Sequence, residues 1–216
     1  ISVRHAIDHA AFKQSGFLYT IDYLDLTNKS SFNEKKQNLN AYNAVILTGG
    51  FGKNGYNEMI EIAKLTRTHN IPTLGICLGF QMMVLEYARN VLGDKEAVTS
   101  ELCPDIRNNL IDIHRESDGE KINMGGTLRK GKYNITYSSM RDTTVENYRF
   151  RHRYHLNLEY IQKKYNSYEY SSSNIIINND LHLKGYAEDI NAPTYLELKS
   201  HKCYIATQAH CELTSR

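Results

Sequence analysis

The chain has 216 residues, 41% of them hydrophobic, and a formal net charge of +2 at pH 7. This length favours one α/β domain with a real core, and the composition excludes a disordered chain. The small net charge does not support a nucleic-acid partner, and the four cysteines lack metal-ligand spacing. Because the cysteines form no C-x-x-C pair, we expect a reduced, cytoplasmic protein without a metal site. Because no stretch of 18 apolar residues occurs, we expect no membrane partner.

The first part of the chain alternates helix-like and strand-like stretches. Residues 2–12 and 57–69 repeat apolar side chains at helical spacing. Residues 18–24 and 44–47 are typical of strands, and the second of these is an apolar run without alternation, as in a buried parallel strand. The polar stretch 27–40 between the two strands indicates a loop or a short surface helix.

A strand, a sharp turn and a helix are predicted around Cys77. An apolar run ends at this cysteine, Gly75 and Gly79 flank it, and helical spacing then continues until Gly93. Two glycines at these positions leave room for a strained turn and for close packing of the helix on the strand. The positive end of the helix favours a thiolate, so Cys77 is a candidate nucleophile.

The second part of the chain is less regular. Residues 99–158 are polar and irregular, and we expect them to cover a site. The last strand is predicted at 203–208, directly before His210 and Glu212. The alternation of strands and helices predicts an α/β fold with a doubly wound, mostly parallel sheet flanked by helices, in a flavodoxin-like sandwich. In such a sheet the strands carry their ligands at one common edge.

A Cys–His–Glu triad is one interpretation of the residues at that edge. His210 would act as the base for Cys77, and Glu212 would orient the imidazole ring. The backbone amides of Gly50 and Leu78 would form an oxyanion hole. The alternatives remain open: a buried cysteine is commonly core packing, a histidine at a strand end is commonly a surface residue, and a glycine pair is commonly a turn.

Several motifs resemble one known family. The residues around Cys77 are similar to the G-x-C-x-G-x-Q signature of class I glutamine amidotransferases, and His210-Cys211-Glu212 resembles that family's H-P-E motif. Further segments resemble its CTP synthase branch, specifically the glutaminase domain. These segments are residues 2–10, 49–52, 85–93, 99–101, 124–131 and 151–157.

The resemblance implies a glutaminase site that agrees with the triad interpretation. Cys77 would be the nucleophile, His210 the acid and base, and Glu212 the orienting carboxylate. Glu101 would face the α-ammonium group of L-glutamine, and Arg153 would help to place its α-carboxylate. The full set of implied substrate-binding residues is Gly50, Leu78, Gly79, Phe80, Gln81, Glu101 and Arg153.

The resemblance also implies a partner. In that family, ammonia passes to a synthase domain on the same chain, which uses ATP, UTP and Mg²⁺ and forms CTP, and GTP activates the glutaminase step. The glutaminase domain itself holds no cofactor. We therefore expect residues 1–216 to be one amidotransferase domain, a fragment that lacks its first strand and the N-terminal synthase domain of a homotetrameric enzyme.

The sequence departs from the family pattern beside the predicted base. Cys211 stands where the family has proline, and Ala209 stands where a bulky aromatic residue usually precedes the histidine. Loss of the proline loosens the turn between His210 and Glu212. The alternatives left open are a weak or silent assembly domain, another class I amidotransferase or γ-glutamyl hydrolase, and a redox-sensing cysteine protein.

Overall fold

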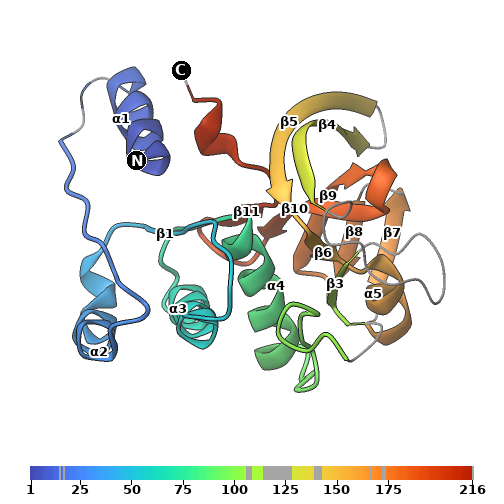
Figure 1. Ribbon diagram of the computed structural model, residues 1–216, viewed down its shortest axis with the longest axis horizontal. Coiled ribbons are helices and arrows are strands. Elements are labelled where there is room, and N and C mark those ends of the chain that lie inside the picture. The colour runs from blue at the N-terminus through green and yellow to red at the C-terminus, as the bar shows by residue number, and fades with distance from the viewer. Residues whose placement is uncertain are drawn as a thin grey trace.

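A curved β-sheet runs through the centre of the protein, with helices on its two faces (Figure 1). The computed structural model describes residues 1–14, 16, 18–105, 109–113, 128–138, 143–165, 167–171 and 174–215. Within these residues the main sheet has nine strands. A separate antiparallel pair is formed by β3 (Ile111–Ile113) and β6 (Tyr154–Leu156).

Three strands of the main sheet are parallel and position the candidate site. β1 (Val45–Leu47) and β11 (Tyr204–Thr207) lie on either side of β2 (Thr73–Ile76), and both pair with it in parallel. Their carboxyl ends therefore lie at the same edge of the sheet. The loop after β1, the turn at Cys77 and the segment leading to His210 follow these three ends directly.

The rest of the main sheet is antiparallel. The expected α/β sheet flanked by helices is confirmed, but its parallel part is limited to β1, β2 and β11. Most of the neighbouring strands follow one another in the chain after a short connection, and a short connection allows only an antiparallel pair. These strands are β4 (Arg129–Ser138), β5 (Thr143–His152), β7 (Ser167–Ser171), β8 (Asn174–Ile177), β9 (Leu181–Ala187) and β10 (Ala192–Leu198).

Two helices are packed tightly against one face of the parallel strands. α3 (Tyr56–Thr68) lies against α4 (Leu78–Asn90), and α4 contacts β1, β2 and β11. Residues 78–88 of α4 are all buried, because the sheet covers one side of the helix and α3 covers another. The helix that follows Cys77 is therefore held firmly in place.

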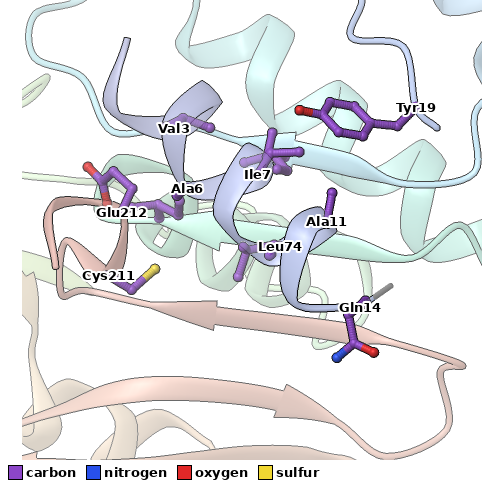
Figure 2. A pocket seen from close by; sticks show the side chains of 12 residues that line it. Val3, Ala6, Ile7, Ala11, Gln14, Tyr19, Leu74, Cys211 and Glu212 are labelled. Atoms are coloured by element: carbon purple, nitrogen blue, oxygen red, sulfur yellow. The ribbon is translucent and has the colours of Figure 1, made fainter. Parts of the chain in front are cut away.

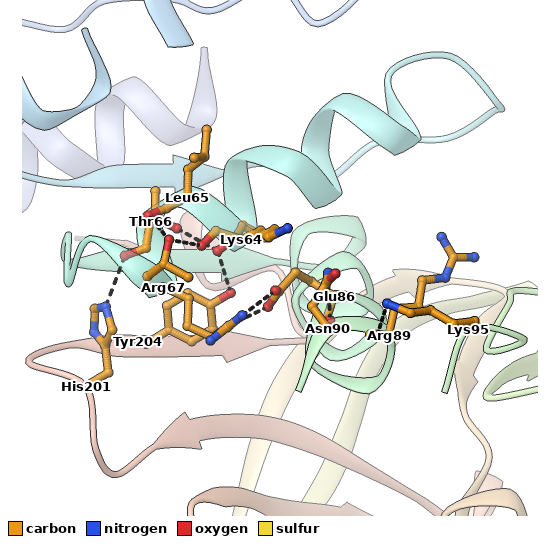
Figure 3. A network of polar contacts seen from close by, with 12 residues as sticks. Lys64, Leu65, Thr66, Arg67, Glu86, Arg89, Asn90, Lys95, His201 and Tyr204 are labelled. Carbon is orange, nitrogen blue, oxygen red and sulfur yellow. Dashed lines mark hydrogen bonds and ion pairs between the residues drawn. The ribbon is translucent and has the colours of Figure 1, made fainter. Parts of the chain in front are cut away.

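A buried ion pair joins these two helices (Figure 3). Arg67 of α3 donates two hydrogen bonds to Glu86 of α4, from Nε and Nη2, each 2.8 Å long. The Glu86 side chain is fully buried, and the carboxylate raises the pKa of Arg67 through this hydrogen bonding. Nearby, the hydroxyl of Tyr204 donates to the carbonyl oxygen of Ala63 at 3.2 Å, so β11 is tied to α3 as well.

The opposite face of the parallel strands is loosely covered. α1 (Ser2–Lys13) lies over this face without a single buried residue. A cavity of about 500 Å³ separates the helix from Leu74 and Ile76 of β2, and Cys211 and Glu212 also line it (Figure 2). The main contact of α1 is with η3 (Cys211–Leu213), the short helix that contains Glu212.

The predicted helices are confirmed at 2–12 and 57–69 and after Cys77. The stretch 27–40 forms a surface helix, α2 (Lys29–Gln37), whose N-cap Asn28 accepts a hydrogen bond from the Ser31 amide at 3.1 Å. The shorter helices are η1 (Leu39–Ala41), α5 (Leu158–Lys164) and η2 (Glu188–Ile190). No helix within the described part of the chain has the length and apolar character needed to cross a membrane.

The strand predicted at 18–24 is wrong. This segment is irregular and pairs with no strand among the described residues. Side chains hold it instead: Tyr42 donates from its hydroxyl to Asp22 at 2.7 Å, and Lys35 donates to the carbonyl oxygen of Tyr23 at 2.7 Å. Strand-like composition shows which residues suit a sheet, but a strand also needs a neighbour for its backbone hydrogen bonds.

Candidate active site

Cys77 sits in a strained turn between β2 and α4. Its φ of 54° and ψ of −98° are rare for a residue with a side chain, and such strain marks functional sites. The Cys77 amide donates to the carbonyl oxygen of Thr207 at 2.8 Å, which ties the turn to the end of β11. Only 3% of Cys77 is exposed. The predicted sharp turn between strand and helix at Cys77 is therefore present.

Two glycines make this elbow sterically feasible. A Cβ atom at Gly79 would lie 2.1 Å from the carbonyl oxygen of Leu47, and one at Gly75 would lie 2.5 Å from the sulfur of Met83. Only a hydrogen atom fits at either position, so the start of α4 can approach β1 and β2 closely. The glycine spacing seen in the sequence thus has a packing cause.

His210 and Glu212 form a hydrogen-bonded pair beside the elbow. His210 Nδ1 lies 2.7 Å from Glu212 Oε1, and the His210 amide donates to the carbonyl oxygen of Arg149 on β5 at 2.8 Å. Because a carboxylate accepts, Nδ1 carries the proton. His210 Nε2 is buried and has no partner other than Cys77 among the described residues.

Gly49 lies against two of the three predicted triad residues. A Cβ atom at Gly49 would lie 3.0 Å from His210 Cε1 and 3.4 Å from Cys77 Cβ. The loop after β1 therefore lies against both side chains. The sequence did not single out Gly49 for this role, although its place at the end of a parallel strand is the signal that would have found it.

The charge state of His210 follows from its neighbours. Cys77 is the largest cause that raises the pKa of His210, and Glu212 adds to it, while burial opposes both; the result is about 10. At neutral pH the ring is therefore an imidazolium held between a sulfur atom and a carboxylate. This arrangement suits a thiolate–imidazolium pair.

The two predicted oxyanion donors are neighbours. A Cβ atom at Gly50 would lie 3.2 Å from Leu78 Cδ2, so the loop after β1 touches the start of α4. Leu78 is the first residue of α4, where backbone N–H groups lack partners inside the helix. Phe80 is fully buried, so only its backbone is available to a ligand, and Gly79 packs against Leu47.

Glu101 holds the glycine-rich loop in place. Its Oε1 accepts a hydrogen bond from the Gly52 amide at 3.1 Å, and its Oε2 accepts from the hydroxyl of Tyr56. Burial and Glu101 raise the pKa of Tyr56, so this hydroxyl stays a donor. Phe51, in the same loop, is 62% exposed, with the Arg151 guanidinium 5.8 Å from its ring centroid.

Arg153 and Glu101 both lie near Tyr154. Burial is the largest cause of the raised pKa of Tyr154; Glu101 raises this pKa further and Arg153 lowers it. Both charged residues that the resemblance assigned to the ends of an amino acid therefore act electrostatically on the same hydroxyl. The G-G-T segment at 125–127 lies outside the described residues, while Arg129, two positions after it, forms an ion pair with Asp189 at 2.5 Å.

Gln81 is linked to Cys77 through Gln208 and is only 3% exposed. Its Nε2 donates to the carbonyl oxygen of Tyr154 at 2.8 Å and to Oε1 of Gln208 at 3.0 Å. Gln208 Nε2 donates in turn to Cys77 Sγ at 3.6 Å. Gln208 was missed in the sequence, where the only signal is its position at the end of the last strand.

Cys211 lines the cavity under α1 (Figure 2). Burial is the largest cause that raises the pKa of its thiol, so this group stays protonated at neutral pH. Glu212 Oε2 is buried and without a hydrogen-bond partner among the described residues. Within the same residues no cluster of histidine, cysteine and carboxylate side chains has the arrangement of a metal site.

Comparisons with known proteins show the family of this chain. A family model described as "Glutamine amidotransferase class-I" matches residues 1–216. The chain belongs to the class I glutamine amidotransferase family. The resemblance inferred from the sequence motifs is thereby confirmed.

The curated relatives of this amidotransferase domain include CTP synthases. The CTP synthase of Lactobacillus johnsonii is 35% identical over 230 residues, and that of Sulfolobus acidocaldarius is 32% identical over 223 residues. Both alignments cover 100% of this chain, but only 38% and 39% of the relatives. The amidotransferase domain therefore spans less than half the length of these relatives.

Solved structures show the same fold. The Trypanosoma brucei CTPS glutaminase domain with bound acivicin matches with a TM-score of 0.78 and 22% identity, covering 100% of this chain and 81% of that one. A glutamine amidotransferase from Thermotoga maritima matches with a TM-score of 0.51 and 16% identity, covering 95% and 69%.

Proposed function

We propose that this amidotransferase domain hydrolyses L-glutamine to glutamate and ammonia through a thioester on Cys77. The observation that carries the proposal is the strained Cys77 turn, with Gly49 lying against both this cysteine and the His210–Glu212 pair. A thiolate, an imidazolium and an orienting carboxylate are the groups that acyl transfer by a cysteine requires.

The first half of the proposed reaction forms the thioester. The Cys77 thiolate attacks the side-chain carboxamide carbon of glutamine, a C–S bond forms, and the carbonyl electron pair moves to oxygen. The amides of Gly50 and Leu78 hold this oxyanion. The C–N bond then breaks, and the proton of His210 goes to the leaving nitrogen, which departs as ammonia.

The second half releases glutamate. His210, now neutral, takes a proton from a water molecule that attacks the thioester carbon. The C–S bond breaks, the sulfur leaves as a thiolate, and His210 is again protonated. Glu212 keeps the Nδ1–H of the ring in place through both halves, which leaves Nε2 for proton transfer.

Substrate recognition is proposed to use the residues around Tyr154. Glu101 would accept from the α-ammonium group, and Arg153 would donate to the α-carboxylate. The buried position of Gln81 is consistent with support of the pocket from below. The backbone of residues 78–80 would line the carboxamide end.

We further propose that this domain works inside a longer CTP synthase. Ammonia would pass to a synthase domain on the same chain, which would bind ATP, UTP and Mg²⁺ and convert UTP to CTP, with GTP as the activator. The support is the similarity to CTP synthases that are more than twice as long. A homotetramer in the cytoplasm belongs to the same proposal.

A comparison of two cysteine variants tests the glutaminase proposal. In a glutamate-release assay on the full chain, Cys77→Ala is expected to abolish activity and labelling by a glutamine-analogue electrophile. Cys211→Ala is the matched control, because its thiol faces the cavity under α1, and it is expected to keep both. Labelling that maps to Cys211, or activity that survives in Cys77→Ala, would contradict the proposal.

A further inference from the structure

A buried side-chain amide touches the nucleophilic sulfur. Gln208 is completely buried, and its backbone amide donates to the carbonyl oxygen of Thr194 at 2.8 Å, which anchors it to β10. Its side-chain Nε2 lies 3.6 Å from Cys77 Sγ, within hydrogen-bond distance for a sulfur acceptor. The triad mechanism makes no use of this contact.

The hydrogen-bond network determines which end of the amide faces the sulfur. The carbonyl oxygen of Tyr154 can only accept hydrogen bonds, and it accepts one from His152 Nδ1 at 2.9 Å and one from Gln81 Nε2 at 2.8 Å. The nitrogen of Gln81 is thereby assigned, and its second hydrogen goes to Gln208 Oε1 at 3.0 Å. The remaining end of Gln208 is an N–H donor, and it points at Cys77.

This donor matters because Cys77 has little access to water. With 3% of the residue exposed, a thiolate here depends on protein donors for its stabilisation. The carbonyl oxygen of Arg151 also lies near the sulfur, at 3.7 Å; it accepts from a thiol but cannot donate to a thiolate. His210 is one donor beside the sulfur, and the side-chain N–H of Gln208 is a second, uncharged one.

We propose that Gln208 is a catalytic residue that stabilises the Cys77 thiolate through an N–H···S hydrogen bond, and that Gln81 is the positioning residue that holds its amide. A hydrogen bond to an ionised acceptor is stronger than one to a neutral acceptor. The contact therefore stabilises the thiolate before attack and again when sulfur leaves the thioester. This role rests on the proposed use of Cys77 as the nucleophile.

The test is the pH dependence of Cys77 alkylation by iodoacetamide, followed by mass spectrometry of the peptide that contains Cys77. Gln208→Met keeps the length of the side chain but removes the donor. We expect it to move the alkylation midpoint to higher pH by roughly one unit, a tenfold loss of thiolate at a fixed lower pH. Gln208→Glu places an acceptor against the sulfur and is expected to move the midpoint further.

Two more variants separate this effect from general loosening. Gln81→Met is expected to shift the midpoint in the same direction but less, because Gln208 keeps its donor and loses only its anchor. Thr194→Val is the control: this side chain is also buried and bonds to the carbonyl oxygen of Gly185, away from the sulfur. Its midpoint is expected to match that of the wild type.

Kinetics give a second readout that a structural role would not move. Gln208 touches the sulfur rather than the substrate, so Gln208→Met is expected to lower kcat for glutamine hydrolysis with little change in KM. A folded Gln208→Met protein with an unshifted midpoint overturns the inference; if this variant does not fold, an unshifted midpoint in Gln208→Glu or Gln81→Met overturns it. If the variants show these shifts but the wild-type protein has no glutaminase activity, the proposed function is overturned instead.

Discussion

The two faces of the parallel strands differ in how firmly they are covered. On the α4 face, glycines allow backbone contact, residues 78–88 are all buried and an ion pair joins the two helices. On the α1 face, a helix without buried residues lies over a cavity of about 500 Å³. Cys77 belongs to the first face, and Glu212 lines the cavity of the second.

This difference divides the proposed triad. Cys77 is held by a turn that α4 and β11 fix from two sides, whereas Glu212 is carried by η3, whose main helical neighbour is the loosely packed α1. Changes on the α4 face should therefore affect folding and activity together. Changes on the α1 face should have small effects, and these effects should be larger on the free energy of unfolding than on activity.

The strongest test of the tight face is Gly79→Ala. The added Cβ atom would lie 2.1 Å from a backbone oxygen, which no side-chain movement relieves. We expect a loss of more than about 4 kcal/mol in the free energy of unfolding, measured by urea denaturation. Gly93→Ala is the control: its φ of 76° gives strain of about 1 to 2 kcal/mol, but nothing lies within 4 Å of the added atom. Equal losses in the two variants would contradict the packing argument.

The ion pair between α3 and α4 is the next test. Glu86→Gln leaves the Arg67 charge without its carboxylate partner in a mostly buried site, at an expected cost of about 3 kcal/mol. Glu61→Gln removes the partner of Lys36 from a pair that is much more exposed and is expected to cost less than about 1 kcal/mol. Denaturation curves of the two variants, measured side by side, test this difference. A similar loss of unfolding free energy in both variants would argue against a special role of Glu86.

Enlarging one alanine on each face tests whether the two faces differ in how tightly they are packed. Ala63→Leu on α3 overfills a fully buried position, and we expect it to lower the free energy of unfolding by about 2 kcal/mol. Ala6→Leu on α1 points into the cavity and is expected to raise that free energy or leave it within about 0.5 kcal/mol. Thermal unfolding of both variants measures the difference, and destabilisation of equal size would show that the two faces are packed alike.

The smallest expected effect is a pH dependence from His152. Burial is the largest cause that lowers the pKa of this buried histidine, to about 3. The unfolded chain binds a proton at His152 near pH 6.5, and the folded chain does not. The folded protein therefore has its full stability, as far as His152 is concerned, above pH 6.5, and it loses stability as the pH falls towards 3. Between pH 7 and 5.5 the loss is about 1 kcal/mol.

His152→Leu removes that titration. Its free energy of unfolding is expected to fall less than that of the wild type over the same pH range, whatever its absolute value at pH 7. The measurement is urea denaturation at both pH values. Parallel changes in the two proteins would show that His152 is not the group responsible.

Much of the site could be predicted because its signals are local. The glycines on either side of Cys77, the helix that follows it and the His-x-Glu spacing are short patterns with direct steric or chemical causes. The parallel strands were found for the same reason, since apolar runs between turns are visible in sequence. The extent of the domain, taken as residues 1–216, stays a prediction.

The antiparallel half and the segment 18–24 were less predictable. Pairing direction depends on which strands become neighbours, and residues 18–24 lack a partner strand among the described residues despite their composition. Glu101 likewise bridges Gly52 and Tyr56, residues that lie 49 and 45 positions away along the chain.

The residue types of the proposed triad, the sharp turn of Cys77 and the alternation of helix and strand around it could be inferred from the amino-acid sequence, because they follow from spacing within a few residues. The contacts that support the sulfur could not. Gln208 reaches Cys77 across 131 positions and Gln81 reaches Gln208 across 127. Such contacts form only when the ends of β2 and β11 are brought together in the sheet, and no local pattern encodes that meeting.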